Sequence, residues 1–257
     1  MATSDGTGVW LRKHKQIEGG TRIYNQSEVS DMVLIPSGEF LMGAVNDEDM
    51  GYTGAFLDEK PQHVVNLEAF NIDVGLVSVE QYHRFMRAAD YRPVTWQDNW
   101  LNAPLQPVRS ISLPDVLEYC DWARKRLPTE AEWEKAARGG LENMLFPWGD
   151  DAFDGTQAAD RTREEGPPDV GTYPPNGFGL YDMVGSLWQW CKDDRRLYTK
   201  DRRHCPVGPL GGETRSARGG DWYTSPFHKR CSRRGSVRVK GGSGNLGFRC
   251  VRDVLKD

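Results

Sequence analysis

The sequence predicts an α+β fold that is rich in loops, with few helices and short antiparallel strands. Three observations lead to this prediction. Short runs before residue 75 alternate apolar and polar residues, three capped helix starts follow before residue 140, and no ten-residue stretch after residue 140 keeps a helical period. The 257 residues, of which 38% are hydrophobic, suffice for one large core. We therefore expect a single domain at 32–257, preceded by an arm or peripheral segment at 1–31.

The first strands are predicted from turn residues and from alternation. Residues 32–35 (MVLI) and 39–43 (EFLMG) flank a Pro-Ser-Gly sequence at 36–38, which favours a hairpin. Residues 63–67 and 70–74 alternate with period two, as half-buried strands do. We expect these two segments to form a second strand pair.

Three helix starts are marked by a hydroxyl N-cap with an acidic or amide residue three positions later, which satisfies two otherwise unpaired backbone N–H groups. The pairs are Ser78 with Gln81, Ser112 with Asp115, and Thr129 with Glu132. Gly139-Gly140 is expected to end the third helix. The apolar faces expected after the three caps are, in order, Val79, Tyr82, Phe85, Met86 and Ala89; Val116, Leu117, Cys120 and Ala123; and Trp133, Ala136 and Ala137.

The net charge of −4 conceals an uneven distribution. Residues 192–240 contain fourteen Lys and Arg against five Asp and Glu, so this segment carries about +9 and the rest of the chain about −13. Either the two parts neutralise each other across the fold, or the basic segment receives an anionic ligand or partner. Nucleic acid is a weaker third interpretation, which requires a steep salt dependence of binding.

The cysteines and the start of the chain bear on the compartment. The cysteines are scattered and lack the close pairs of a structural zinc site, so free thiols are expected. The first residues lack the basic start and apolar stretch of a secretory signal, and no apolar run has the length of a membrane span. We expect a cytoplasmic protein without membrane contact.

Six motifs occur in a fixed order and carry a family resemblance. They are RLPTEAEWE from residue 126, FPWG from 146, PPNGFGLYDMVG from 174, WQW from 188, RGGDW from 218 and NLGFR from 245. In this order they resemble the sulfatase-modifying-factor family over about residues 32–252. That family includes formylglycine-generating enzymes, ergothioneine sulfoxide synthase domains, pyoverdine-maturation proteins and variable proteins of diversity-generating retroelements. The resemblance implies the C-type-lectin-like fold of formylglycine-generating enzymes.

The resemblance also identifies what the chain lacks. Formylglycine-generating members bind copper through a cysteine pair that follows the Gly-Gly motif, because cuprous ion prefers thiolates. Here the corresponding segment, residues 219–231, is shorter than the loop of those enzymes and holds no cysteine before Cys231. No catalytic residue and no copper site are therefore assigned. The five histidines show no ligand-like pairing, and no iron site is recognised. By resemblance, Cys231 and Cys120 are expected to be buried core thiols, close enough to cross-link under oxidation.

A calcium site is the metal site that the resemblance implies. Its ligands are expected to be the side chains of Asp182 and Gln189 and the backbone carbonyls of Gly185 and Leu187, all of which are hard oxygen donors. Alternatively, Gln189 only hydrogen-bonds its loop. A second calcium site of the family is not carried over, because its loop is shortened here at 160–169.

The segment between the last two motifs supplies the candidate binding residues. Side chains on a rigid frame commonly serve recognition, and tyrosine and arginine are frequent in binding hot spots. A solvated basic surface is the alternative. The candidate ligand-binding residues are Asp221, Tyr223, Thr224, Ser225, Phe227, His228, Arg233, Arg234, Ser236, Arg238 and Lys240.

Two functions from different classes follow. The first is a lectin-like module that binds a ligand or a protein, in the manner of a diversified variable protein or a partner-neutralising protein. Lys229 and Lys240 disfavour a retroelement-diversified origin. The second is an oxygen-dependent oxidase or sulfur-chemistry enzyme of the same family with a different metal site.

Overall fold

The computed structural model describes residues 15–16, 22–23, 30–44, 57–240 and 243–254. Most of the expected arm lies outside these ranges. Within it, β1 (Lys15–Gln16) pairs antiparallel with β2 (Arg22–Ile23).

The helices occur where the N-caps predict them. The α-helices are α1 (Val79–Ala89), α2 (Leu113–Ala123) and α3 (Glu130–Arg138), and the 3-10 helices are η2 (Leu57–Glu59), η3 (Asp98–Asn102) and η4 (Pro226–Lys229). Ser78 and Thr129 form complete capping boxes with Gln81 and Glu132, and the Ser112 hydroxyl accepts from the N–H of Asp115. Gly139 ends α3 with a left-handed φ of 61°.

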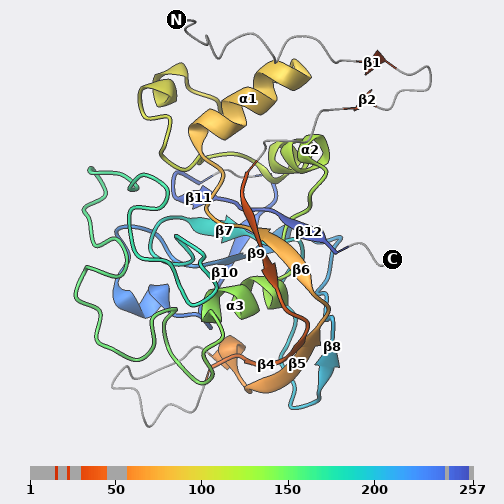
Figure 1. Ribbon diagram of the computed structural model, residues 1–257, viewed down its shortest axis with the longest axis vertical. Coiled ribbons are helices and arrows are strands. Elements are labelled where there is room, and N and C mark those ends of the chain that lie inside the picture. The colour runs from red at the N-terminus through yellow and green to blue at the C-terminus, as the bar shows by residue number, and fades with distance from the viewer. Residues whose placement is uncertain (1–14, 17–21, 24–29, 45–56, 241–242, 255–257) are drawn as a thin grey trace, which may run out of the picture.

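The buried faces of the helices agree with the sequence prediction at every residue but one. Leu117 in α2 is 49% exposed. Tyr119 and Leu113 are buried in its place, because the buried stripe of α2 runs through positions 113, 116, 119, 120 and 123. Every residue of α3 is buried. Figure 1 shows why: α3 lies at the centre of the molecule, with α1 and α2 toward one end and β4 (Gly38–Met42), β5 (His63–Leu67) and β8 (Arg203–His204) toward the other.

The four predicted N-terminal strands exist, but their predicted pairing is wrong. They are β3 (Met32–Ile35), β4 (Gly38–Met42), β5 (His63–Leu67) and β6 (Phe70–Asp73). β3 pairs with β6 and β4 with β5, all antiparallel, so neither expected hairpin forms.

The Pro-Ser-Gly sequence bends the chain and does not reverse it. The ammonium group of Lys135 in α3 donates to the carbonyl oxygens of Pro36 and Gly38, at 2.8 Å each. This contact fixes the bend against the central helix. β3 and β4 therefore continue as one bent ribbon, which lies beside the ribbon of β5 and β6.

Three sheets complete the α+β architecture. Their strand orders are β12-β6-β3, β4-β5-β8 and β10-β9-β7-β11, and the pairs β5 with β8 and β7 with β11 are parallel. Among the described residues, no α-helix follows Arg138, and none of the helices is long and apolar enough to cross a membrane. The remaining strands are β7 (Trp188–Trp190), β8 (Arg203–His204), β9 (Thr214–Arg218), β10 (Arg234–Arg238), β11 (Leu246–Gly247) and β12 (Val251–Asp253).

The cysteines are free thiols, but the expected proximity of Cys120 to Cys231 is wrong. Cys120 lies in the core between α1 and α2, where its Sγ is 3.6 Å from the Sγ of Cys250. Cys231 is also buried, as expected, but in a separate core around α3. The sequence did not indicate that Cys120 lies near Cys250. Residues 245–250 return to the core beside α2, whereas Cys231 lies in the core beside α3.

Candidate functional site

Arginines that the sequence places in the basic segment form a buried ionic frame. Arg230 binds Glu59 through two hydrogen bonds of 2.9 and 3.0 Å, and Arg234 binds Glu130 through two of 2.7 Å. Both guanidinium groups are about 1% exposed. Paired, bidentate contacts of this kind compensate the cost of burying charge.

Glu134 joins two further arginines at the centre of the frame. Its carboxylate accepts from Arg218, from Arg138 at 2.6 Å and from the N–H of Gly43 at 2.8 Å. Burial alone would raise the pKa of Glu134, but the charges of Arg138 and Arg218 more than reverse this effect and hold the pKa below its ordinary value. We call the seven residues of this network the buried frame: Glu59, Glu130, Glu134, Arg138, Arg218, Arg230 and Arg234.

The buried frame accounts for part of the uneven charge distribution. Arg218, Arg230 and Arg234 come from the basic segment, whereas Glu59, Glu130 and Glu134 come from the acidic remainder. These three arginines of the basic segment are thus neutralised inside the fold by three carboxylates of the acidic remainder. Arg234 was expected on the binding face, and its burial against Glu130 corrects that prediction.

Asp221 is also buried and organises the loop that carries the candidate face. Its carboxylate accepts from the backbone N–H groups of Tyr223 and Thr224, at 3.3 and 3.0 Å, and from the side-chain amide of Asn245 at 2.5 Å. The expectation that Asp221 is an exposed ligand contact is therefore wrong. At Gly220, with φ of 66°, a Cβ would lie 2.6 Å from the carbonyl oxygen of His228, so the turn requires glycine.

The other predicted binding residues reach the surface. Ser225, Ser236, Arg238 and Lys240 are exposed. A second set, which includes Ser225, is called the 223–233 face: Tyr223, Thr224, Ser225, Phe227, His228 and Arg233. Ser225 is exposed, and the other five residues are partly buried.

The 223–233 face rests directly on the buried frame. The guanidinium of Arg230 lies 4.2 Å from the ring of Phe227 and donates to the Phe227 carbonyl oxygen at 2.9 Å. Arg233 donates to the imidazole of His228 at 3.2 Å. Burial, and then the charge of Arg233, lower the pKa of His228, so its ring is neutral at pH 7.

Trp188 and Asn245 adjoin this face, although the sequence did not mark them as site residues. Arg233 lies 5.9 Å from the Trp188 ring, and the Asn245 amide donates to the Tyr223 hydroxyl at 3.2 Å. Both residues belong to the motifs that carry the family resemblance, and nothing in the sequence marked either for this role.

Gln189 is held by hydrogen bonds on both sides of its amide. The amide nitrogen donates to the carbonyl oxygens of Asp182 and Met183, at 2.9 Å each, and the amide oxygen accepts from Trp133 at 2.9 Å and from Arg249 at 2.8 Å. A carboxamide has two donors and two acceptor positions, and all four are used here.

Arg249 brings a positive charge to the same loop. Its fully buried guanidinium also donates to the carbonyl oxygens of Asp73 at 3.1 Å and Tyr181 at 2.6 Å. Burial without a bound carboxylate lowers the pKa of Arg249 to about 10, so the group stays charged at pH 7. Arg249 therefore joins three separate segments of the chain.

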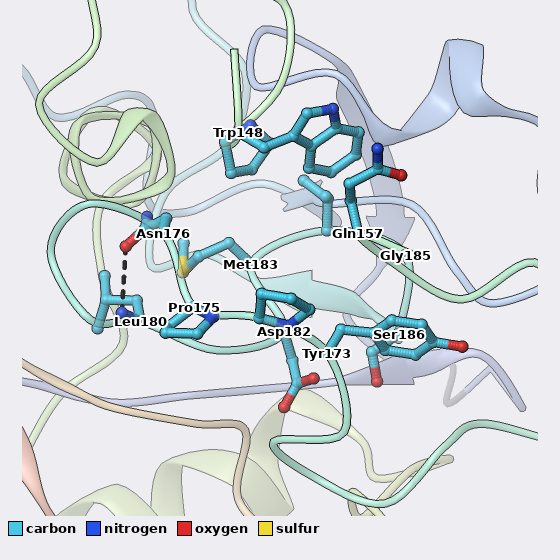
Figure 2. Close-up of a pocket in the computed structure, with 13 residues that line it drawn as sticks. Trp148, Gln157, Tyr173, Pro175, Asn176, Leu180, Asp182, Met183, Gly185 and Ser186 are labelled. Carbon is cyan, nitrogen blue, oxygen red and sulfur yellow. Dashed lines mark hydrogen bonds between the residues drawn. The ribbon is translucent and has the colours of Figure 1, made fainter. Parts of the chain in front are cut away.

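A small cleft lies beside this loop. Figure 2 shows Trp148 on one side of it and Pro175 and Tyr173 on the other, with Asn176 fixed by its hydrogen bond to the N–H of Leu180. The cleft measures about 70 Å³, well below the several hundred Å³ of pockets that enclose drug-sized ligands. The cleft is therefore too small to bind a larger ligand.

Residues 21–254 match the family described as the sulfatase-modifying factor enzyme 1-like domain. The chain belongs to this family. Its few helices, short sheets and loop-rich second half are those of the formylglycine-generating-enzyme-like fold.

Individual relatives of this sulfatase-modifying-factor family member agree with the assignment. The chain is 31% identical to the formylglycine-generating enzyme of Bos taurus over 290 residues, which cover 89% of this chain and 76% of the relative. The structure of PvdO from Pseudomonas aeruginosa is similar with a TM-score of 0.74 at 25% identity, covering 90% of this chain and 97% of that one. Treponema denticola variable protein 1 shares the fold with a TM-score of 0.69 at 21% identity, covering 86% and 94% of the two chains.

The thiols of this family member differ from a copper-binding pair. Cys231 is fully buried, and burial raises its pKa to about 12, so it remains a protonated thiol at pH 7. Burial also raises the pKa of Cys191 and Cys250, while Cys205 is exposed. In the described ranges, no three His, Cys, Asp or Glu side chains are grouped so as to hold a metal ion.

The loop of Asp182 and Gln189 does not fit a calcium ion as it is arranged. The Gln189 oxygen is occupied by two N–H donors, one of them from the Arg249 cation. Asp182 is buried and accepts from the N–H of Gly171 at 2.8 Å. A dication bound by the expected four residues would compete with Arg249 for the same oxygen. The calcium site of Asp182, Gly185, Leu187 and Gln189 stays a prediction from the resemblance.

Proposed function

We propose that this family member is a binding module that holds a protein or an anionic ligand on the 223–233 face. One observation carries the proposal. The segment in which the resemblance places the catalytic cysteine pair instead presents Tyr223, Ser225, Phe227 and His228 at the surface, directly above the buried frame.

The construction of the face favours recognition. A rigid base reduces the ordering cost of binding, and here Asp221 fixes the loop from one side and Arg230 from the other. Aromatic side chains with adjacent guanidinium groups are the residue types most often found in binding hot spots. Copper is not part of this proposal, because Cys231, the thiol at the end of segment 219–231, is buried.

Selection of peptides from a random displayed library against the immobilised full chain tests the proposal. We expect selected peptides to lose about thirtyfold or more in affinity on Tyr223→Ala or Phe227→Ala, as at hot spots. Phe178→Ala, a partly buried aromatic residue outside the face, is the matched control and should change affinity little.

Because Phe227 contacts the buried frame, a second variant separates binding from folding. Ser225 is exposed and its side chain makes no capping hydrogen bond, so Ser225→Trp should leave the melting temperature unchanged while it blocks the face. Peptides that bind Tyr223→Ala and Ser225→Trp as tightly as the wild type would show that the binding site lies elsewhere.

A further inference from the structure

Two arginines outside the basic segment lie over the aromatic pair that borders the 223–233 face. Arg109 lies 5.8 Å from the ring of Trp222, and Arg163 lies 5.5 Å from the ring of Tyr223. The two rings contact each other edge to face, with centroids 5.0 Å apart. The guanidinium groups therefore flank one continuous aromatic pair.

Arg109 carries a charge that no carboxylate compensates. It is partly buried, and among the described residues it makes no hydrogen bond and no ion pair. Burial is the sole cause that shifts its pKa, which is lowered as expected for a cation without an acidic neighbour. By contrast, the five arginines that are buried in the described ranges are held by carboxylates or carbonyl oxygens: Arg138, Arg218, Arg230, Arg234 and Arg249.

Arg163 is exposed on a loop that is fixed to Trp222. The Arg161 N–H donates to the Trp222 carbonyl oxygen, and the Trp222 indole N–H donates to the Thr162 carbonyl oxygen, both at 3.0 Å. The neighbouring carboxylate of Glu165 accepts from the Thr162 N–H at 2.6 Å and is thereby turned back onto its own loop. Arg163 itself makes no ion pair within the described ranges.

The hydroxyl of Tyr223, whose ring lies under Arg163, adds a third donor to the same aromatic pair. It accepts from Asn245, and in the described part of the chain no acceptor takes its own proton. A guanidinium that lies over an aromatic ring keeps its N–H groups free at the edge, where they match the oxygen atoms of phosphate or carboxylate groups. The nearby Asp221 carboxylate is buried and accepts from two backbone N–H groups and from Asn245, and in the described ranges it forms no hydrogen bond or ion pair with these donors.

We infer that Arg109, Arg163 and the Tyr223 hydroxyl form an oxyanion site, which binds a phosphate or carboxylate group of the ligand. The inference rests on the proposed function and names the chemistry of its ligand. It places the anionic contact at Trp222 and Tyr223, on residues that are not part of the basic strand β10. Neither arginine lies in the segment that the sequence marks as basic.

Calorimetric titration of the full chain with inorganic pyrophosphate, and separately with citrate, tests the site. We expect Arg109→Ala and Arg163→Ala each to weaken binding about tenfold, and Tyr223→Phe to weaken it less, because charge-assisted hydrogen bonds exceed neutral ones. Arg238→Ala removes the same charge from an exposed position of β10 and should have little effect. Binding of pyrophosphate alone identifies a phosphate site, and binding of both anions a general oxyanion site.

Two results would overturn the inference. One is that neither anion binds, and the other is that Arg238→Ala weakens binding as much as Arg109→Ala, which would indicate nonspecific attraction to a basic surface. The proposed function is judged separately, because peptides that lose affinity on Ser225→Trp support it whether or not the anions bind.

Discussion

Glu134→Gln is expected to lower the free energy of unfolding by about 3 to 5 kcal/mol, as when one partner of a buried ion pair is removed. The glutamine keeps the size of the side chain but leaves Arg138 and Arg218 without their shared carboxylate. Urea denaturation at pH 7 measures the effect. Since Arg218 belongs to β9 and Arg138 to α3, the loss should loosen the base of the 223–233 face.

The matched control is Glu80→Gln in α1. Glu80 and Arg84 are also an i,i+4 pair on a helix, but their side chains are 48% and 49% exposed, and such a pair contributes less than about 0.5 kcal/mol. If the two substitutions cost the same, Glu134 does not hold the buried frame together.

The pH dependence gives a second readout for Glu134. Its pKa is lower in the folded protein than its ordinary value of 4.5, so its contribution to stability is present above that value and is lost as the pH falls through the folded pKa. Glu134→Gln should therefore be less sensitive to acid than the wild type. This comparison needs no knowledge of the ligand.

Gln189→Met is expected to cost about 3 to 4 kcal/mol, because methionine keeps the length of the side chain but satisfies none of its four buried partners. These partners are the Trp133 indole, the Arg249 guanidinium and the carbonyl oxygens of Asp182 and Met183. Gln157→Met, at a partly exposed glutamine, should change stability by no more than about 0.5 kcal/mol. Chemical denaturation of both variants measures the two changes in the free energy of unfolding, and equal changes would contradict the role of Gln189.

The arrangement of the Asp182 and Gln189 loop also predicts how calcium affects the stability of the protein. A site with a dissociation constant near 10⁻⁶ M would stabilise the fold by about 4 kcal/mol at 1 mM calcium. Because Arg249 already occupies the Gln189 oxygen, we expect the melting temperature of the wild type to be the same in excess calcium and in EDTA. A clear rise with calcium would show that Asp182 and Gln189 rearrange to bind it.

Local features of this fold were predictable from the sequence, and pairing between distant segments was not. The caps at Ser78 and Thr129 depend on residues three positions apart, so the sequence contains the whole interaction. The pairing of β3 with β6 depends on a bend that Lys135 fixes from almost 100 residues away. No pattern within residues 32–43 indicates the contact of Lys135 with the carbonyl oxygens of Pro36 and Gly38.

The site shows the same division. The sequence indicated Tyr223 and Phe227 as binding candidates from their position between two motifs, and both are partly exposed. It treated Arg234 as a surface residue because its partner, Glu130, lies 104 positions away. Arg109 and Arg163 were not predicted, because each is defined by an aromatic ring in a distant segment. The charge count of residues 192–240 suggested where an anion would bind, yet several of those arginines are internal.

Metal content most directly separates a recognition face from an oxidase site. The protein should be produced with copper and iron in the medium, purified without chelators and measured by plasma mass spectrometry for metal per chain. With Cys231 buried and no second thiol on the 223–233 face, we expect both metals at far less than one atom per chain. One copper or iron atom per chain would contradict this account and favour the alternative of an oxygen-dependent oxidase.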